Sequence, residues 1–567
     1  MKTKNTLLTF LAMVFASSIN AQSPSYKWTK TFGGAKSEYI NSIIADKNGN
    51  VLSTGSFESS IDIDPGASVK TIVSNGGSDI FVTKMDAAGK LLWSKNIGGS
   101  ANDVGYSIAV DTGGNVYVTG SFQDYVDFGV STPLYSSGSE DVFVVKYDAA
   151  GTVLWAKSIG GSYADYGRSI SLDTLGGLYV TGKFLGMADF DPSSNYVSLS
   201  SSMGSEDVFI VKWDQNGIYQ WAKGIGSAGY DVGTAIAVNP SGDVFATGIF
   251  SGPVNFNPLS AAVYANSVGL QDVYFAKYDR NGIFQWVKSF GSTDNDYSRG
   301  IAIDNKSNVY ITGYFSGVAF FDPAGLSKKV SATGGYDAFV CKLDKSGTLA
   351  WANPLGGVYS DFGYAVSVDD KGNVYTTGSF ESTADFDPSP AATINLSSNG
   401  SSDIFISKMD ANGNGLWATN LGGTANDEGS SVFVYKNNDI YTAGDFRNTA
   451  DFNYEAAIDN FTSNGSTDAY IHKISMSANS ISYNSLDVKM ELFPNPTDGI
   501  VNLRINNVQQ DELTLSLFDA RGALIQVQHI KDNQASIDLS GQASGIYFVK
   551  LAASDASTSR LISIVRR

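Results

Sequence analysis

The chain has 567 residues, a formal net charge of −18, and only 17% charged residues. Such an acidic surface repels nucleic acid and anionic lipid and is compatible with divalent cations or basic partners, so nucleic acid is excluded as a partner. The 60 glycines, 32 Phe and 29 Tyr are typical of a turn-rich all-β protein, and the only cysteine, Cys341, excludes an intrachain disulfide.

Residues 1–21 have the pattern of a secretory signal peptide. Two lysines precede an apolar run from Leu7 to Ala16, which is too short to span a bilayer. We expect cleavage between Ala21 and Gln22, and no lipoprotein anchor, because no cysteine follows that site. No later stretch is apolar enough to be transmembrane, so the mature chain is expected to have no transmembrane segment.

A repeat of about 65 residues fills residues 22–474. Each unit contains four β-rich runs, joined in two halves by Asp/Gly/Asn turns that favour hairpins. Seven of the eight tryptophans follow this period, whereas Trp213 lies outside it. The seven are Trp28, Trp93, Trp155, Trp221, Trp286, Trp351 and Trp417. Seven four-stranded units predict a seven-bladed β-propeller in which these tryptophans are structural.

A second motif, Asp-x-Phe/Tyr-x-x-Lys, also occurs once in each unit. It begins at Asp79, Asp141, Asp207, Asp272, Asp337, Asp403 and Asp468. Many strands around it have apolar residues on both faces, which is expected where blades stack on each other.

The register of the repeat predicts how the ring closes. The last unit ends at Ile474 without a tryptophan strand, while the chain begins with an unpaired one, Trp28–Gly34. We therefore expect the N-terminal strand to become the outermost strand of blade seven, which removes open sheet edges. An open solenoid is the competing arrangement.

The stretch from Gly98 to Phe122, GGSANDVGYSIAVDTGGNVYVTGSF, resembles the bacterial SBBP β-propeller repeat. The resemblance covers residues 26–474. The seventh unit departs from it, with Tyr435 and Asn437 where other units have Asp or Asn and Gly. The resemblance implies a propeller fold and an extracytoplasmic location, but no fixed ligand or activity.

A Ser/Asn-rich linker, residues 475–486, precedes a different pattern. Residues 487–567 contain short runs with alternating apolar positions, separated by turns at Gly522 and Gly545. This pattern predicts a small C-terminal Ig-like β-sandwich.

The same segment resembles the type A C-terminal sorting domain of the type IX secretion system of Bacteroidota. The residues that carry the resemblance include Pro494, Asn495, Pro496, Gly499, Gly545, Tyr547 and Lys550. The resemblance implies contact with the type IX secretion machinery, passage through the outer membrane, removal of the domain, and release or surface attachment. A stalk-like accessory domain is the alternative.

The composition argues against nucleophilic and metal chemistry. The only histidines, His472 and His529, fall in different predicted domains, so neither a Ser-His-Asp triad nor a histidine zinc site is expected. Cys341 occupies the register of His472 in its own repeat and is interpreted as a packing residue. Asp410–Gly415 imitates the start of an EF-hand loop, but Leu421 replaces its glutamate, so structural Ca²⁺ is only a minor alternative to a hairpin turn. No other cofactor is expected.

One carboxylate recurs in the loop before each unit. The set is Glu38, Asp103, Asp165, Asp231, Asp296, Asp361 and Asp427. Because the seven loops converge on one propeller face, the set could form a ring that binds a cation or a basic group. Seven identical loop-bracing hydrogen bonds are the interpretation we favour. Like-charge repulsion in a close ring would raise the pKa values of its members.

A further motif, Asp-Phe/Ile-Asp/Asn-Pro, lies in the long middle loop of four units. Its four copies are 62–65, 189–192, 255–258 and 385–388. Asn255 replaces the first Asp in one of them, which suits turn chemistry better than acid catalysis. A glycosidase-type carboxylate pair is the alternative.

Together these features predict a secreted or cell-surface propeller that acts as a binding or scaffold module and not as an enzyme. Its convergent loops would contact a polymer, glycan or protein. An extracellular carboxylate-based hydrolase or lyase acting on polysaccharide is the first alternative, and a structural surface-layer component is the second.

Overall fold

The computed structural model describes residues 24–193, 195–322, 328–389, 391–436, 438–455, 457–476, 489–506, 513–519, 524–530, 534–553 and 556–564. The expected signal peptide with Ala21, and residues 477–486 of the expected linker, lie outside these ranges. The chain divides into two compact units, residues 1–476 and 477–567, which are described separately. Within the described ranges every regular element is a strand, and no helix is long and apolar enough to cross a membrane.

The first unit consists of groups of four antiparallel strands. In order from the inner to the outer strand, the first three groups are β2 (Glu38–Ala45), β3 (Val51–Asp62), β4 (Thr71–Met85), β5 (Leu91–Ile97); β6 (Val104–Val110), β7 (Val116–Val126), β8 (Leu134–Tyr147), β9 (Val153–Gly161); and β10 (Tyr166–Leu172), β11 (Leu178–Leu185), β14 (Glu206–Trp213), β15 (Tyr219–Ile225).

Four more groups follow in the same order. They are β16 (Val232–Val238), β17 (Val244–Phe250), β20 (Asp272–Tyr278), β21 (Phe284–Phe290); β22 (Tyr297–Ile303), β23 (Val309–Phe320), β24 (Lys329–Leu343), β25 (Leu349–Gly357); β26 (Phe362–Val368), β27 (Val374–Asp385), β28 (Asn395–Met409), β29 (Gly415–Gly423); and β30 (Glu428–Tyr435), β31 (Asp439–Phe446), β34 (Asp468–Met476), β1 (Pro24–Phe32).

Six three-residue strands lie in the long middle loops: β12 (Met187–Asp189), β13 (Ser198–Ser200), β18 (Pro253–Asn255), β19 (Tyr264–Asn266), β32 (Thr449–Asp451) and β33 (Asn460–Thr462). Some of them connect neighbouring groups, since β12 pairs with β9 and β32 pairs with β29. These middle loops therefore tie their own group to the outer strand of the group before it.

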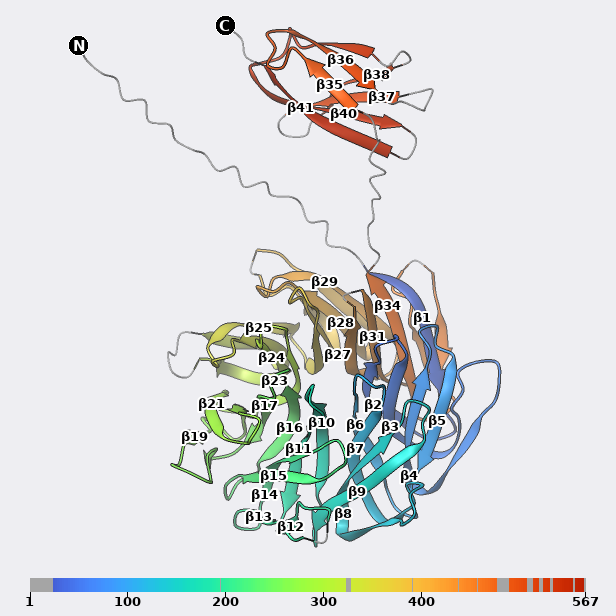
Figure 1. Ribbon diagram of the computed structural model, residues 1–567, viewed down its shortest axis with the longest axis vertical. Helices are drawn as coiled ribbons and strands as arrows, with labels where there is room; N and C mark the ends of the chain where they lie inside the picture. Colours follow the sequence, from blue (N-terminus) through green and yellow to red (C-terminus); the bar gives the residue numbers. More distant parts are fainter. Residues whose placement is uncertain are drawn as a thin grey trace, which may run out of the picture. The chain divides into compact units, whose positions relative to one another are not determined.

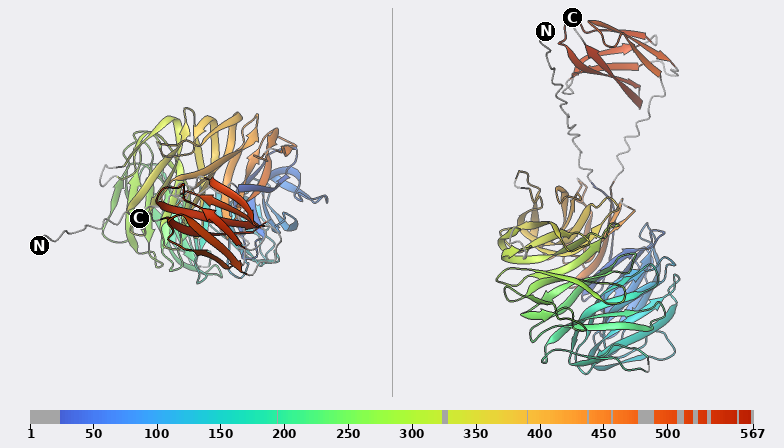
Figure 2. Two further views of the ribbon diagram at one scale, coloured as in Figure 1. Left: turned by 90° about the horizontal axis from the view of Figure 1, so that it is seen from above. Right: turned by 60° about the vertical axis from the view of Figure 1, so that its left-hand side comes forward.

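The inner strands form a continuous circle around a central axis (Figures 1 and 2). Each inner strand contacts the inner strands of the groups before and after it, and β30 contacts β2. A small residue at the contact allows this close approach. A Cβ added to Gly105 would lie 2.3 Å from Oγ1 of Thr54 in the preceding group.

The N-terminal strand β1 is the outer strand of the last group. It pairs with β34 from Pro24↔Met476 to Phe32↔Ala469. Ser475 and Met476, which the sequence analysis assigns to the linker, belong to β34. They pair with Ser25 and Pro24 of β1.

The in-register tryptophans and the motif lysines join one group to the next. The indole Nε1 of Trp93 and the ammonium Nζ of Lys84 both donate to the carbonyl oxygen of Ala149, at 3.3 and 3.2 Å. The same shared bond recurs at the carbonyls of Ala87, Gln215, Arg280 and Ala411. Most of these tryptophans are only partly buried. Trp213, outside the register, is the most buried tryptophan, at 1% exposure.

Apolar side chains fill the space between successive groups. One cluster combines Ile80 and Val82 of β4 with Val118 of β7 and Phe143 of β8, all at 0% exposure. Strands in the middle of a group are buried on both faces for this reason. The core is therefore a series of layers between groups and not a single central core.

The second unit has two sheets around one apolar core. Its strands are β35 (Lys489–Phe493), β36 (Ile500–Asn506), β37 (Leu513–Phe518), β38 (Leu524–Ile530), β39 (Gln534–Asp538), β40 (Gly545–Ala553) and β41 (Ala556–Ile564). The sheet orders are β35-β36-β39 and β38-β37-β40-β41. Val501, Leu515 and Val549 come from both sheets and are 0% exposed. The unit is a small two-sheet sandwich.

Candidate functional site

Each inner strand of the first unit carries a β-bulge at the same point of the repeat. The pairing register shifts between Gly105 and Ser107 of β6, for example, so that Tyr106 has no partner on β7. A bulge leaves one residue out of the ladder and redirects its side chain. The seven residues at this position are Asn41, Tyr106, Arg168, Thr234, Arg299, Tyr364 and Ser430.

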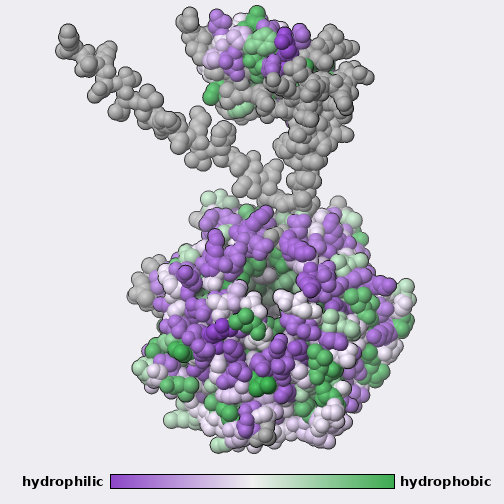
Figure 3. Space-filling view, in the orientation of Figure 1, coloured by the Kyte–Doolittle hydropathy of each residue, from purple (hydrophilic) through white to green (hydrophobic). Residues whose placement is uncertain are grey.

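These seven residues all line one cavity on the axis of the first unit. The cavity has a volume of about 650 Å³. Ligand sites in proteins commonly measure about 300–1,000 Å³. In the space-filling view the first unit is hollowed near its centre (Figure 3). We call this cavity, with its seven bulge residues, the channel.

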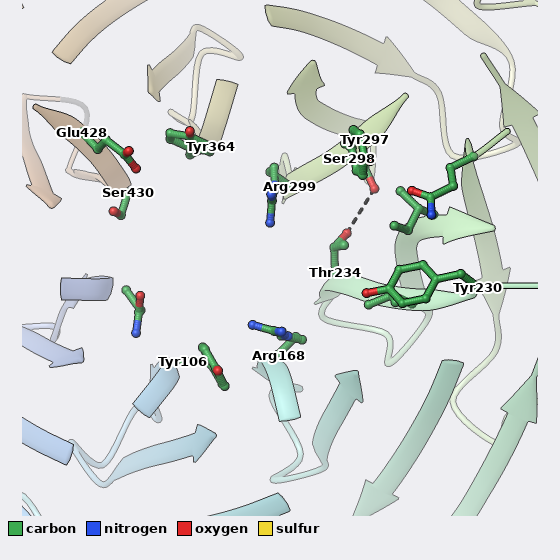
Figure 4. Close-up of a pocket in the computed structure, with 14 residues that line it drawn as sticks. Tyr106, Arg168, Tyr230, Thr234, Tyr297, Ser298, Arg299, Tyr364, Glu428 and Ser430 are labelled. Carbon is green, nitrogen blue, oxygen red and sulfur yellow. Dashed lines mark hydrogen bonds between the residues drawn. The ribbon is translucent and has the colours of Figure 1, made fainter. Parts of the chain in front are cut away.

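Arg168 projects into the channel from β10 (Figure 4). Its guanidinium lies over the ring of Tyr106, 4.4 Å from the ring centroid, and 5.2 Å from that of Tyr166. The arginine is half-buried. Aromatic faces attract a guanidinium through their quadrupole, so the two tyrosines hold Arg168 without using its N–H donors.

Arg299 enters the same space from β22 (Figure 4). One of its nitrogens, Nη2, donates to the hydroxyl of Tyr314 at 3.0 Å, and the guanidinium lies 5.5 Å from the ring centroid of Tyr314. Tyr314 is fixed by edge-to-face contacts with Tyr336 and Phe362. Arg299 is exposed, and an arginine has five N–H donors, so most of its donors face the channel.

The facing wall carries an acidic group. Glu428 and Ser430 of β30 lie across the channel from Arg168, and Tyr364 of β26 lies between Glu428 and Arg299 (Figure 4). Burial raises the pKa of Glu428, against the opposing effect of Arg447 and Arg299. Burial also raises the pKa of its strand partner Asp445 well above the ordinary value. The channel therefore has a basic side, with Arg168 and Arg299, and an acidic side, with Glu428.

The recurring loop carboxylates lie beside the channel but are buried in the loops. Asp103 accepts the backbone N–H of Gly99 through Oδ2 at 2.7 Å and that of Gln123 through Oδ1 at 3.0 Å. All seven members are at most 1% exposed, and each accepts from the residue four positions before it. These bonds connect each carboxylate to the backbone of its own loop, as loop bracing requires.

A second carboxylate, the Asp of the Asp-x-Phe/Tyr-x-x-Lys motif, lies next to each loop carboxylate. Burial is the main cause that raises the pKa of Asp103 to about 6, and burial raises that of Asp79 to about 6, with a further contribution from Asp103. Glycine makes room for the pair, since a Cβ on Gly98 would lie 2.2 Å from Cγ of Asp79. Burial likewise raises the pKa of Glu38 to about 8 and of Asp165 to about 7.

The Asp-Phe/Ile-Asp/Asn-Pro copies form turns. Oδ1 of Asp62 accepts the backbone N–H groups of Asp64 and Lys70, and Oδ1 of Asn255 makes the equivalent pair of bonds to Asn257 and Val263. Asn can replace Asp because only one acceptor oxygen is needed. The motif thus closes a loop.

The remaining polar candidates are also parts of the scaffold. Oδ1 of Asp410 accepts the N–H groups of Asn412 and Asn414 in a hairpin turn. Cys341 is fully buried, and burial raises the pKa of its thiol. His472 contacts Thr29 Oγ1 at 2.9 Å, and burial lowers the pKa of the ring to about 3. No group of three or more His, Cys, Asp or Glu side chains that could hold a metal ion occurs among the described residues.

The motif residues of the second unit lie mostly on its surface. Pro494, Asn495 and Pro496 are exposed, as are Gly545 and Lys550, and Gly499 is half-buried. Tyr547 is 7% exposed and donates its hydroxyl to the carbonyl of Ala543 at 2.9 Å. Exposed motif residues on a small folded unit are available to a recognising partner.

The sequence motifs did not identify the channel. Its residues differ from repeat to repeat, so a search for shared chemistry passes over them. A positional signal exists nevertheless, because each channel residue stands three positions after a loop carboxylate, as Tyr106 does after Asp103. The bulge position is therefore a variable position of the repeat, surrounded by positions that are the same in most repeats.

Two protein-family models match the chain. The model described as a secretion system C-terminal sorting domain matches residues 491–565. The model described as a beta-propeller repeat matches residues 92–121, 154–183 and 285–314. These matches confirm both resemblances seen in the sequence.

The chain is also similar, at lower identity, to two longer proteins. The chain is 25% identical over 505 residues to the uncharacterized WD repeat-containing protein L264 of Acanthamoeba polyphaga mimivirus, covering 75% of this chain and 36% of that protein. It is 24% identical over 312 residues to the regulatory protein FlaEY of Caulobacter vibrioides, covering 50% and 32%. The chain thus spans about a third of the length of these relatives. A solved structural genomics protein of unknown function from Bacteroides thetaiotaomicron shares 11% identity at a TM-score of 0.19, over 60% of this chain and 95% of that one.

Proposed function

Since the chain is an exported protein with SBBP-type propeller repeats and a type IX sorting domain, we propose that it is a secreted or surface-displayed binding protein. Its first unit is then a closed seven-bladed propeller that binds its ligand in the channel, and it has no catalytic activity. The second unit is an Ig-like sorting sandwich, removed near residue 480 to leave the mature propeller.

The contrast between repeated and variable positions carries this proposal. The loop carboxylates, the glycines beside them and the shared Trp–Lys bonds recur around the first unit because they build the scaffold. The bulge position makes no hydrogen bond that recurs around the first unit, and its seven side chains include two Arg, two Tyr and three smaller polar residues. Different polar side chains that converge on one cavity are the usual makeup of a ligand site.

The same geometry supports a binding role over hydrolysis. A catalytic carboxylate must reach the substrate within hydrogen-bond distance. The loop carboxylates instead accept backbone N–H groups in closed loops, and the middle-loop copies such as Asp62 do the same. A surface-layer component would have no need for variable residues inside its axis.

The test is a binding screen of the exported protein, purified from its host, against arrays of glycans and peptides. A Ser430→Trp variant would fill the channel, whereas Gln220→Trp places the same bulk on the exposed outer strand β15. We expect Ser430→Trp alone to abolish binding. Binding that persists in Ser430→Trp, or turnover of any substrate on the arrays, would contradict the proposal.

A further inference from the structure

We propose that the ligand of the channel is an acidic saccharide whose carboxylate or sulfate group binds between Arg168 and Arg299. This inference rests on the proposed function and names the chemical class that the channel takes. The two arginines come from different groups of strands, and both extend toward the same open space (Figure 4).

Neither arginine has a carboxylate partner in the described part of the chain. Five ion pairs are present there, and they involve Lys84, Lys183, Lys277, Arg280 and Lys473. What sets these two cations apart is their place, because both line one cavity and no carboxylate of the described residues lies within ion-pair distance of either. An anion that enters the channel would supply the missing partner.

Both guanidinium groups are held in place before a ligand arrives. Tyr106 and Tyr166 flank Arg168, and Tyr314 positions Arg299 through its ring and its hydroxyl. Ordering a side chain in advance lowers the entropic cost of binding. The planar fork of a guanidinium also matches the two oxygens of a carboxylate or sulfate group.

The remaining wall suits a sugar better than a peptide. Hydroxyl and amide groups of Thr234, Gln271 and Asn41 line the channel, together with the rings of Tyr230 and Tyr297, whereas Ser298 is buried beneath Thr234 and bonds it at 3.1 Å. Such groups exchange hydrogen bonds with several hydroxyls, and exposed aromatic faces pack on the apolar faces of sugar rings. Only Val232 and Ile249 are aliphatic. An apolar peptide side chain would find little to bury against.

Isothermal titration of the full-length protein with three oligosaccharide probes tests the inference. The probes are oligogalacturonate for the carboxylate, sulfated galacto-oligosaccharide for the sulfate, and neutral galacto-oligosaccharide of equal length. We expect one of the two acidic probes to bind at least about 10-fold more tightly than the neutral probe, since a hydrogen bond to a charged group contributes about 1.5–3 kcal/mol. The better acidic probe identifies the anionic group.

Substitutions then connect the preference to the two arginines. Arg168→Gln and Arg299→Gln should each weaken the acidic probe about 10-fold and leave a neutral probe unchanged. Arg280→Gln removes the same charge at an outer turn and should have no effect. Glu428→Gln removes the facing negative charge and should tighten binding. Unchanged melting temperatures establish that the variants are folded.

Two results would overturn the inference. In the first, neutral galacto-oligosaccharide binds as tightly as the acidic probes, and Ser430→Trp abolishes this binding. The channel would then bind a neutral sugar, and the proposed function would remain intact. The second is an oligo-aspartate peptide that binds more tightly than every saccharide. If no probe or array ligand binds in the channel at all, the proposed function itself fails.

Discussion

Trp28 and Lys473 donate hydrogen bonds to the same carbonyl oxygen, that of Ala87, each at 3.2 Å. The two residues are direct partners in the pairing of β1 with β34, although they stand at opposite ends of the first unit. Within the ring, Trp93 and Lys84 share the carbonyl of Ala149 in the same way. The junction between the two ends of the first unit is therefore built like the junctions inside it.

We predict that deletion of residues 26–34 causes aggregation. The deletion removes most of β1 and exposes the hydrogen-bonding edge of β34, and exposed edges pair with other chains. Size-exclusion chromatography of the purified variant measures the outcome. Removal of residues 22 and 23 alone, which precede β1, is the control and should leave a monomer. A deletion variant that stays monomeric with unchanged melting would contradict the prediction.

The two classes of tryptophan should differ in their effect on stability. Trp213 is 1% exposed, so Trp213→Ala should lower the free energy of unfolding by about 3–5 kcal/mol. Trp221 is only partly buried, so Trp221→Ala should cost about 2–3 kcal/mol. Trp221→Phe keeps most of the packing and should cost about 1 kcal/mol for the lost bond to Arg280.

Urea denaturation followed by circular dichroism measures these differences. Saccharide or protein binding should survive in all three variants, because neither tryptophan lines the channel. A Trp221→Ala protein with wild-type stability and lost binding would make Trp221 a contact residue instead.

Stability should fall as the pH rises from about 5 to about 8. Burial raises the pKa of Glu38 from 4.5 to about 8 and that of Asp165 from 3.8 to about 7. A carboxyl group with a raised pKa binds more protons in the folded state than in the unfolded state over this range. Its contribution is fully present below the unfolded value and is lost as the pH passes the folded value.

Differential scanning calorimetry at the two pH values measures this effect, with a lower melting temperature expected at the higher pH. Burial is the main cause of the raised pKa of Glu38, and the charges of Asp468 and Glu58 add to it. Glu38→Gln should therefore reduce the difference between the two melting temperatures. A melting temperature that rises with pH, or a Gln variant with the full difference, would contradict the prediction.

Removal of residues 487–567 should trap folded protein in the periplasm. The family match shows that this segment contains a secretion sorting domain, and an already folded propeller has no route of its own through the outer membrane. Cell fractionation and blotting of the native host measure the location. The full-length Arg280→Gln variant should be exported normally. Recovery of the truncated form in the medium would show that the segment is an accessory domain.

Much of the fold could be predicted because its stabilising residues recur. The period of the tryptophans indicated the four-stranded units, and the missing tryptophan strand after Ile474 indicated where the N-terminal strand pairs. The short strands such as β12 could not be predicted, since they form through pairing with β9 of another repeat. The partial exposure of Trp221 could not be predicted either, because the burial of this side chain depends on how neighbouring groups of strands stack.

The loop carboxylates and the channel show where sequence reasoning succeeds and fails for a site. Asp103 repeats because a loop needs its two acceptors, and repetition favoured the bracing interpretation. Arg168 and Arg299 share no chemistry with the other repeats, although each stands three positions after a loop carboxylate. Their convergence depends on the closure of the ring and on a bulge that redirects each side chain, neither of which is encoded in a local motif.

The pairing of β1 with β34 also sets an order of events for the nascent chain. Thr29 meets His472 across 443 residues of sequence, so β1 is synthesised long before its partner β34 exists. Long-range pairing of this kind is slow, because loop closure costs entropy before any contact is gained. Closure is thus a late step in folding, and the last group of strands lacks its outer strand until then.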